Sequence, residues 1–157
     1  MKTMLLTLLL SNLLAHFNTR SLYNEISVKD ELDRSAVVFT GTVINNEKIT
    51  VRDTLPRSIE EYHWMRYSVK VDKVYKGNVK TDIVTVITGV GNGDYGYVFF
   101  TGHRYVVYGD NAGCFNPNGS APPCFMTNAC RRTRPFDQKE IISIEKCRTR
   151  YRTPALP

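Results

Sequence analysis

The residue types that most often carry chemistry are sparse and scattered in this sequence. The three histidines stand at positions 16, 63 and 103, and no acid or nucleophile is spaced near them as a catalytic triad requires. Glu60 and Glu61 are adjacent on one segment, whereas glycoside hydrolysis needs two carboxylates that face each other across a cleft. We therefore expect a protein that is not an enzyme and has no catalytic residues.

A glycine-rich stretch, residues 89–96, follows a predicted strand, which is one part of the context of a phosphate-binding loop. No helix signal follows it and no Lys-Ser/Thr pair ends it, so the nucleotide-binding interpretation fails this test. We expect a hairpin loop here, and no cofactor.

Four cysteines are candidates for disulfide bonds: Cys114, Cys124, Cys130 and Cys147. The alternative, a zinc site, lacks a Cys-x-x-Cys pair or close Cys/His spacing, so no metal ligands are assigned. Four cysteines allow three pairings, and the sequence does not choose among them. A Cys114–Cys124 bridge would close the irregular loop between them, and Cys130 with Cys147 would then link the last helix to the sheet. Each bridge would stabilise the fold by about 2–3 kcal/mol.

The first segment has the pattern of a targeting sequence. A short basic start is followed by an apolar run from Met4 to Leu14, the length of a signal-peptide core and too short to span a membrane. A buried N-terminal helix is the alternative. We expect a signal peptide over 1–15, an N-terminal arm over 16–26 and no transmembrane span. The location would be secreted, that is periplasmic or extracellular, where disulfides are permitted.

The whole chain has 157 residues, which is enough for one domain, and the part that follows the predicted arm has the pattern of a mostly-β fold. Ser27 is an N-cap residue type followed by acids, so a short helix is expected near 28–35. A second helix is expected after the capping box that begins at Asp137, ending near 146. Alternation and β-branched residues predict strands over these ranges: 36–43, 48–51, 62–71, 82–88, 97–100, 104–108 and 125–126. One face of a strand is predicted to hold Val37, Phe39, Gly41 and Val43, and one face of another Tyr67, Val69 and Val71. Gly41 inside the first strand predicts a bulge or a close backbone approach. A turn is expected at 45–47 and a loop at 52–61.

About five main strands with short helices at both ends predict a small closed barrel or sandwich. We assign the domain to 27–147, followed by a basic tail over 148–157. Residues 131–157 hold 8 Lys/Arg and 3 Asp/Glu, whereas residues 1–130 hold 13 and 12, so the excess charge lies at the C-terminal end. Such an end either is simply solvated or contacts an anionic partner.

Several ordered segments resemble the tissue inhibitors of metalloproteinases, in a bacterial-type version. They are Ala36 to Val43, then Val69-x-Val71-x-x-Val74-Tyr75-Lys76-Gly77, then Thr85-Val86-x-Thr88-Gly89, Gly96 to Tyr108, and Asn128 to Pro135. The resemblance covers about residues 27–145. It implies a netrin-like OB fold, so the expected architecture is a small five-stranded OB-type barrel with flanking short helices.

The resemblance also implies a function, a non-catalytic protein-binding module that inhibits an extracellular metalloprotease by binding the protease's own zinc. In that family the mature chain starts with Cys-x-Cys, whose α-amino group and carbonyl chelate the zinc. This sequence has no Cys before Cys114, and His16 stands about where that start would be, so the chelating residues do not carry over. A mature start at His16 would offer an α-amino group and an imidazole instead. Cys130 matches a family Cys whose usual partner lies in that missing start.

Other candidate partner-binding residues come from single features. His63 and Trp64 lie at the edge of a predicted strand, where an exposed Trp anchors partners, although a core or rim Trp is the commoner case. The alternative function is binding of a polyanion or an envelope surface by an OB module through its Arg-rich end. The residues of that end are Arg131, Arg132, Arg134, Arg148, Arg150 and Arg152.

Overall fold

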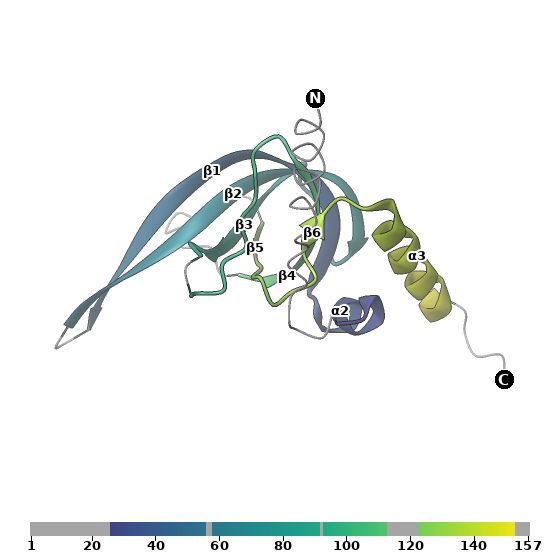
Figure 1. Ribbon diagram of the computed structural model, residues 1–157, viewed down its shortest axis with the longest axis horizontal. Coiled ribbons are helices and arrows are strands. Elements are labelled where there is room, and N and C mark those ends of the chain that lie inside the picture. Colours follow the sequence, from purple (N-terminus) through teal and green to yellow (C-terminus); the bar gives the residue numbers. More distant parts are fainter. Residues whose placement is uncertain (1–25, 56–57, 92, 113–122, 153–157) are drawn as a thin grey trace, which may run out of the picture.

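The computed structural model describes residues 26–55, 58–91, 93–112 and 123–152 (Figure 1). The predicted signal peptide and most of the predicted arm therefore lie outside the described residues. The elements, in chain order, are α2 (Val28–Arg34), β1 (Val37–Leu55), β2 (Ser58–Lys76), β3 (Ile83–Gly89), β4 (Arg104–Asn111), β5 (Cys124–Met126), β6 (Arg134–Pro135) and α3 (Gln138–Arg152).

The strands pair in the order β1-β2-β3-β5-β4-β6, and β1 also pairs with β4. The first five strands therefore close into a ring, in which only the β3–β5 pairing is parallel. The expected mostly-β fold, a small five-stranded OB-type architecture with short flanking helices, is confirmed.

At Gly41 the β1–β2 register shifts, and an added Cβ would lie 2.6 Å from the carbonyl oxygen of Lys70, so the bulge and the close approach predicted for this glycine both occur.

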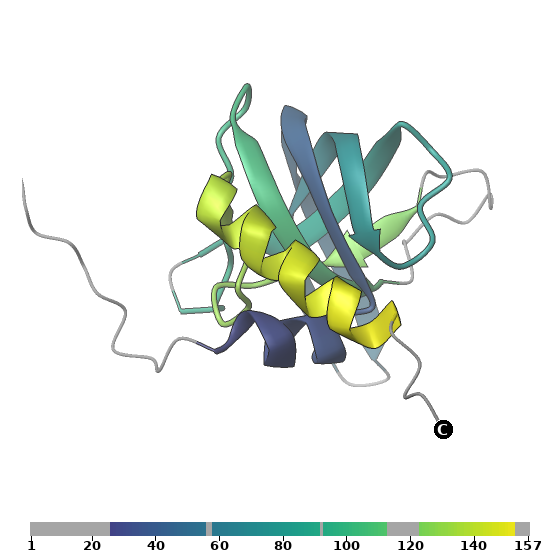
Figure 2. The same cartoon turned by 90° about the vertical axis from the view of Figure 1, so that its right-hand side faces the viewer.

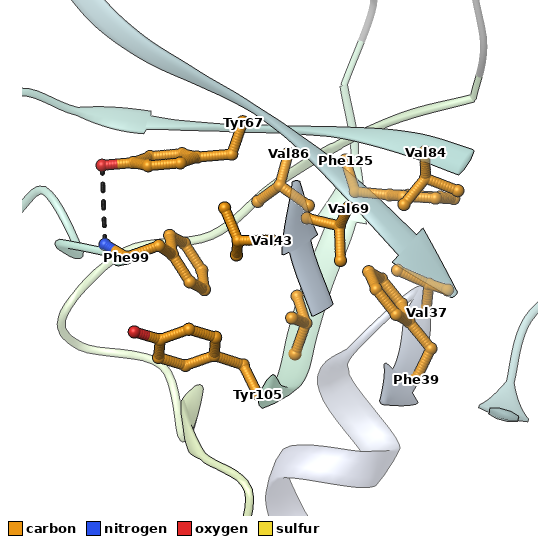
Figure 3. Close-up of a cluster of buried hydrophobic side chains, with 11 residues drawn as sticks. Val37, Phe39, Val43, Tyr67, Val69, Val84, Val86, Phe99, Tyr105 and Phe125 are labelled. Carbon is orange, nitrogen blue, oxygen red and sulfur yellow. Dashed lines mark hydrogen bonds between the residues drawn. The ribbon is translucent and has the colours of Figure 1, made fainter. Parts of the chain in front are cut away.

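The inside of the ring is filled by valines and aromatic rings (Figure 3). Tyr67, Phe99 and Tyr105 pack with their ring centroids 4.9 Å apart in two successive edge-to-face pairs. The predicted inward positions of β1 and β2, Val37, Phe39, Val43, Tyr67 and Val69, all lie in this cluster. The period-2 pattern of the sequence therefore correctly predicted which side chains of β1 and β2 face the inside of the ring.

A second apolar cluster joins the outside of the ring to the two helices, which lie beside each other on the same side of the sheet (Figure 2). Val38 of β1 and Val106 of β4 point outward to meet Leu32 of α2 and Ile141 and Ile144 of α3. Because these strands are covered on both faces, their sequence is a nearly continuous apolar run instead of an alternating one.

The Tyr75-Lys76-Gly77 sequence has three structural roles at the end of β2. Tyr75 is buried in the helix-facing cluster, and the Lys76 ammonium donates to the carbonyls of Leu32 (2.5 Å) and Asp33 (3.0 Å) at the C-terminal end of α2. A cation at this position satisfies carbonyls that have no partner within the helix, and its charge interacts favourably with the negative end of the helix dipole. Gly77 has φ +86° and an added Cβ would lie 2.7 Å from the Ala36 carbonyl oxygen, so glycine is required here.

The prediction of a turn at 45–47, a separate short strand at 48–51 and a loop at 52–61 was wrong. β1 continues to Leu55 and β2 starts at Ser58, and the two form one long hairpin that extends away from the ring (Figure 1). A register shift between Val43 and Asn45 absorbs the turn-favouring residues without ending the strand. Ladder pairing with β2 therefore overrode the local preference of Asn45-Asn46.

Two further boundaries differ from the sequence-based expectation. Residues 97–100 form no strand, because their backbone N–H groups bond to side chains: Tyr97 N–H donates to Thr88 Oγ1 and Phe100 N–H to the Tyr105 hydroxyl. The last helix continues to Arg152, beyond the predicted end at 146. Its first turn uses only half of the predicted capping box, since Asp137 accepts from the Lys139 N–H, while Glu140 faces Arg132.

Candidate interaction surface

The loop from Gly93 to His103, between β3 and β4, exposes large apolar side chains. Tyr95 is 59% exposed, Val98 55% and Phe100 62%, while Phe99, between Val98 and Phe100, is buried in the ring. Ile44 of β1, 44% exposed, stands next to Val43, which accepts a bond from Gly102 N–H at 2.7 Å. Exposed apolar side chains gathered on one loop are typical of a contact surface for another molecule.

Backbone hydrogen bonds fix this loop on the ring. Val43 N–H donates to the His103 carbonyl at 3.0 Å, in addition to accepting from Gly102. The Tyr105 hydroxyl accepts from Phe100 N–H at 2.9 Å, and the side-chain amide of Asn46 donates to Thr101 Oγ1 at 2.7 Å. The apolar side chains are therefore presented on an ordered backbone.

Burial also suppresses ionisation of the tyrosines that hold the loop. Removal from water, with a smaller effect of neighbouring Tyr105, raises the pKa of Tyr97 to about 12. Burial likewise raises the pKa of Tyr67, whose hydroxyl faces the Phe99 N–H at 3.5 Å, partly offset by that hydrogen bond (Figure 3). Both phenols are neutral over the physiological pH range.

The glycine-rich stretch, residues 89–96, overlaps the start of this loop and folds around the carboxylate of Asp94. Asp94 accepts from the N–H groups of Val90 (2.6 Å), Gly91 (2.8 Å) and Gly96 (3.0 Å). Partial desolvation raises the pKa of Asp94, but these three bonds outweigh it, so that its pKa lies below the ordinary value. At Gly96, an added Cβ would overlap the Gly89 carbonyl oxygen, so the close approach requires glycine.

Tyr95 joins this loop to the segment that follows β5. Its φ is +57°, the left-handed region that a non-glycine residue rarely occupies, and its carbonyl accepts from Ala129 N–H at 2.7 Å. Backbone strain of this kind costs about 1–3 kcal/mol and is concentrated at functional positions. In this conformation the backbone of Tyr95 is bonded to Ala129 of the 128–132 segment, while its side chain is exposed.

The 128–132 segment in turn contacts the start of the described chain. Arg132 Nη1 donates to the Ile26 carbonyl at 2.7 Å, and Arg34 Nη2 of α2 donates to the Cys130 carbonyl at 3.2 Å. The 128–132 segment therefore contacts both the 93–103 loop, through Ala129, and the chain at Ile26, through Arg132. We call the exposed part of these three segments the candidate surface.

Three of the six arginines that were predicted to bind a partner lie in the 128–132 segment or directly after it, but they contact acidic groups. Arg132 donates to both carboxylate oxygens of Glu140 (2.6 and 2.7 Å), and Arg134 lies 3.6 Å from the same carboxylate. Arg131 donates to Asp110 at 2.6 Å and lies 3.3 Å from the buried carboxylate of Glu31. Their charge is largely balanced within the fold.

Glu140 and its partners form a buried polar group. The carboxylate is 3% exposed and accepts, besides Arg132, the hydroxyl of Tyr108 at 2.5 Å. Burial, followed by the hydrogen bond and the charge of Glu140, raises the pKa of Tyr108 far above its ordinary value. A buried carboxylate of this kind is stable because a bidentate guanidinium and a neutral hydroxyl satisfy it.

The other predicted partner-binding residues are dispersed. Exposed His63 faces Thr50 Oγ1 through Nδ1 at 3.1 Å, and half-buried Trp64 pairs in register with Ile49 and with Gly89, where the glycine-rich stretch begins. Arg148 of α3 lies over the Tyr75 ring, 5.9 Å from its centroid. His16 and the side chains of Arg150 and Arg152 lie outside the described part of the chain.

Two of the four candidate cysteines are free, which excludes the Cys130–Cys147 bridge considered above. Cys130, exposed, and Cys147, half-buried on α3, are free thiols, so that bridge is not formed. Helix α3 is held to the ring by Ile141, Ile144 and the Glu140 contacts instead. Cys124 is disulfide-bonded, whereas Cys114 lies outside the described residues, so that the Cys114–Cys124 bridge stays a prediction.

Sequence reasoning missed the exposed apolar residues and the buried acids. A usable signal for the first was the run Tyr97 to Phe100, because four consecutive apolar residues in an extended chain cannot all face one core. Glu31 and Glu140 carried no such signal, since both stand in first turns of helices, where acids are commonly exposed.

The fold and this surface define a mostly-β, OB-type domain with an ordered apolar loop. No known protein-family profile and no curated protein sequence matches the chain. Within the described residues, no group of three or more His, Cys, Asp or Glu side chains is arranged to hold a metal ion. In the same part of the chain, no helix has the length and apolar character needed to cross a membrane.

Proposed function

We propose that this chain is an exported, non-catalytic protein-binding module that contacts its partner through the candidate surface. The observation that carries the proposal is the exposure of Tyr95, Val98 and Phe100 on a backbone held by hydrogen bonds to the ring. Aromatic side chains on a fixed backbone lose little conformational freedom on binding, which is the usual character of interface anchors.

Metalloprotease inhibition is the specific activity we propose, on the basis of the resemblance stated above. The geometry supports it in one respect, because the chain at Ile26, where the predicted N-terminal arm ends, contacts the 128–132 segment, and the same segment contacts Tyr95 through Ala129. An arm leaving there would reach the same partner as the loop. In the absence of an N-terminal Cys, the zinc ligands would be the α-amino group and, for a start at His16, its imidazole.

The experiment is inhibition of a panel of zinc endopeptidases by the mature protein, whose N-terminus is defined by mass spectrometry. We expect inhibition that falls after selective acetylation of the α-amino group and after Phe100→Ala. Inhibition that survives acetylation but not Phe100→Ala would place the contact on the loop alone. No inhibition at micromolar concentrations would refute the inhibitor proposal.

The alternative, polyanion binding through the Arg-rich end, is less well supported. Arg131, Arg132 and Arg134 are paired with Asp110, Glu31 and Glu140, so they offer little net charge to a polyanion. Heparin binding whose affinity falls steeply with salt concentration would favour the alternative. We expect weak binding with a shallow salt dependence.

A further inference from the structure

The guanidinium of Arg132 contacts two parts of the chain that are far apart in sequence. Nη1 donates to the Ile26 carbonyl, where the N-terminal arm joins the domain, at 2.7 Å. Nε and Nη2 donate to the two oxygens of Glu140 on α3. The Arg132 side chain is only 11% exposed, so water competes little for these bonds.

The group that orients Arg132 is itself fixed. Glu140 accepts the hydroxyl of Tyr108, a fully buried residue of β4, and the neighbouring Thr133 Oγ1 accepts the Tyr108 N–H. A planar guanidinium can serve a carboxylate with two N–H groups and a carbonyl with a third. A lysine ammonium keeps the charge but lacks this fixed fork, so it cannot hold both partners in the same geometry.

We infer that Arg132 is a positioning residue that anchors the chain at Ile26, the last residue of the predicted N-terminal arm, beside the 128–132 segment. That this matters for partner binding rests on the proposed function. The anchoring itself does not, because it depends only on the contacts among Arg132, Ile26 and Glu140. Arg132 does not contact the partner in this proposal; it sets where the arm begins.

The anchoring is tested by hydrogen exchange on the mature chain with Arg132→Lys. The matched control is Arg134→Lys, since Arg134 lies two residues further along the chain, 3.6 Å from the same Glu140 carboxylate. We expect amides over 26–31 to exchange about tenfold faster in Arg132→Lys, the effect of losing one bond to a charged donor, and less than about twofold faster in the control. Unchanged exchange in Arg132→Lys, or equal changes in both variants, would overturn the inference.

The role in binding is tested by a double-mutant cycle in which residues 16–24 are replaced by a Gly-Ser segment of equal length. We expect Arg132→Lys to weaken inhibition of the most sensitive zinc endopeptidase about tenfold in the native arm, and not at all with the replaced arm. Equal weakening in both backgrounds would mean that Arg132 is only structural, and would overturn its positioning role. If the wild-type chain inhibits no protease, the proposed function fails, and hydrogen exchange alone supports or overturns the anchor.

Discussion

The hydroxyl of Tyr108 on β4 donates a 2.5 Å hydrogen bond to the carboxylate of Glu140 on α3, and both side chains are buried. Since Arg132 bonds to the same carboxylate, the contact joins the ring, the last helix and the 128–132 segment through one acidic group. The helix is therefore docked by a polar network as well as by the apolar contacts of Ile141 and Ile144.

The first prediction concerns this carboxylate. Glu140→Gln removes the charge that balances nearly buried Arg132, and we expect it to lower the free energy of unfolding by about 3 kcal/mol. The control is Glu145→Gln on the same helix, whose ion pair with Lys73 is solvent-exposed and is expected to contribute little to stability. Urea unfolding of both variants measures the difference. Equal, small losses in the two variants would show that the buried pair contributes little.

The second prediction concerns pH. Because the pKa of Asp94 is lowered in the folded chain, its stabilising bonds to the loop are fully formed above its ordinary pKa of 3.8. They are lost as the pH falls from that value through the lower folded pKa. We expect the protection of the Gly96 amide, which donates to this carboxylate, to fall below pH 3.8 when its exchange rate is compared with the intrinsic rate at the same pH. Asp94→Asn should show the same loss of protection already at neutral pH, and a loop as well protected in this variant as in the wild type would contradict this account.

The third prediction separates the surface from the core within two adjacent residues. Phe100→Ala removes an exposed ring, so we expect a stability change within about 0.5 kcal/mol and a loss of partner binding of at least about tenfold. Phe99→Ala should cost about 3–5 kcal/mol of stability, because its ring fills the centre of the closed sheet. Thermal unfolding and inhibition assays on the two variants test this, and unchanged binding by Phe100→Ala would exclude this ring as an anchor.

The fourth prediction compares two glycines in the left-handed region. Gly102 has φ +83° with no atom within 4 Å of an added Cβ, so Gly102→Ala should cost about 1–2 kcal/mol from the backbone alone. Gly77→Ala has the same backbone cost and in addition places its Cβ 2.7 Å from the Ala36 carbonyl oxygen. We expect an extra cost of about 1–3 kcal/mol in denaturant unfolding. Equal costs at the two positions would mean that the chain near Ala36 moves aside freely.

The fifth prediction concerns the thiols. Without reduction, iodoacetamide should alkylate Cys130 and Cys147, and Cys130 should react faster because it is exposed. Peptide mapping by mass spectrometry identifies the modified residues. A cross-linked peptide that contains both cysteines would contradict the structure and restore a pairing that the sequence left open.

Local sequence patterns determined much of the fold. Ser27 with the following acids predicted α2, and its side chain does cap the helix by accepting from Asp30 N–H. The alternation Tyr67, Val69 and Val71 found the inward face of β2, and the glycine within β1 marked a bulge. These features follow from the helix and strand periods and from backbone sterics, which act over a few residues.

Tertiary structure decided what the same local rules left open. Asn45 and Asn46 favour a turn, yet the ladder with β2 continues the strand to Leu55, because inter-strand hydrogen bonds outweigh a local preference. Glu140 fits a capping box, yet it turns to Arg132 and Tyr108, since only the folded ring brings these groups within reach.

For the candidate surface, too, the sequence determined some features and the tertiary structure decided others. The sequence by itself determined a basic C-terminal end, a mostly-β domain and the positions of glycine. The fold decided that Arg131, Arg132 and Arg134 meet acids from α2, β4 and α3, and that Tyr95, Val98 and Phe100 are left in water. Charge balance depends on contacts between residues as distant in the chain as Glu31 and Arg131, which no local pattern encodes.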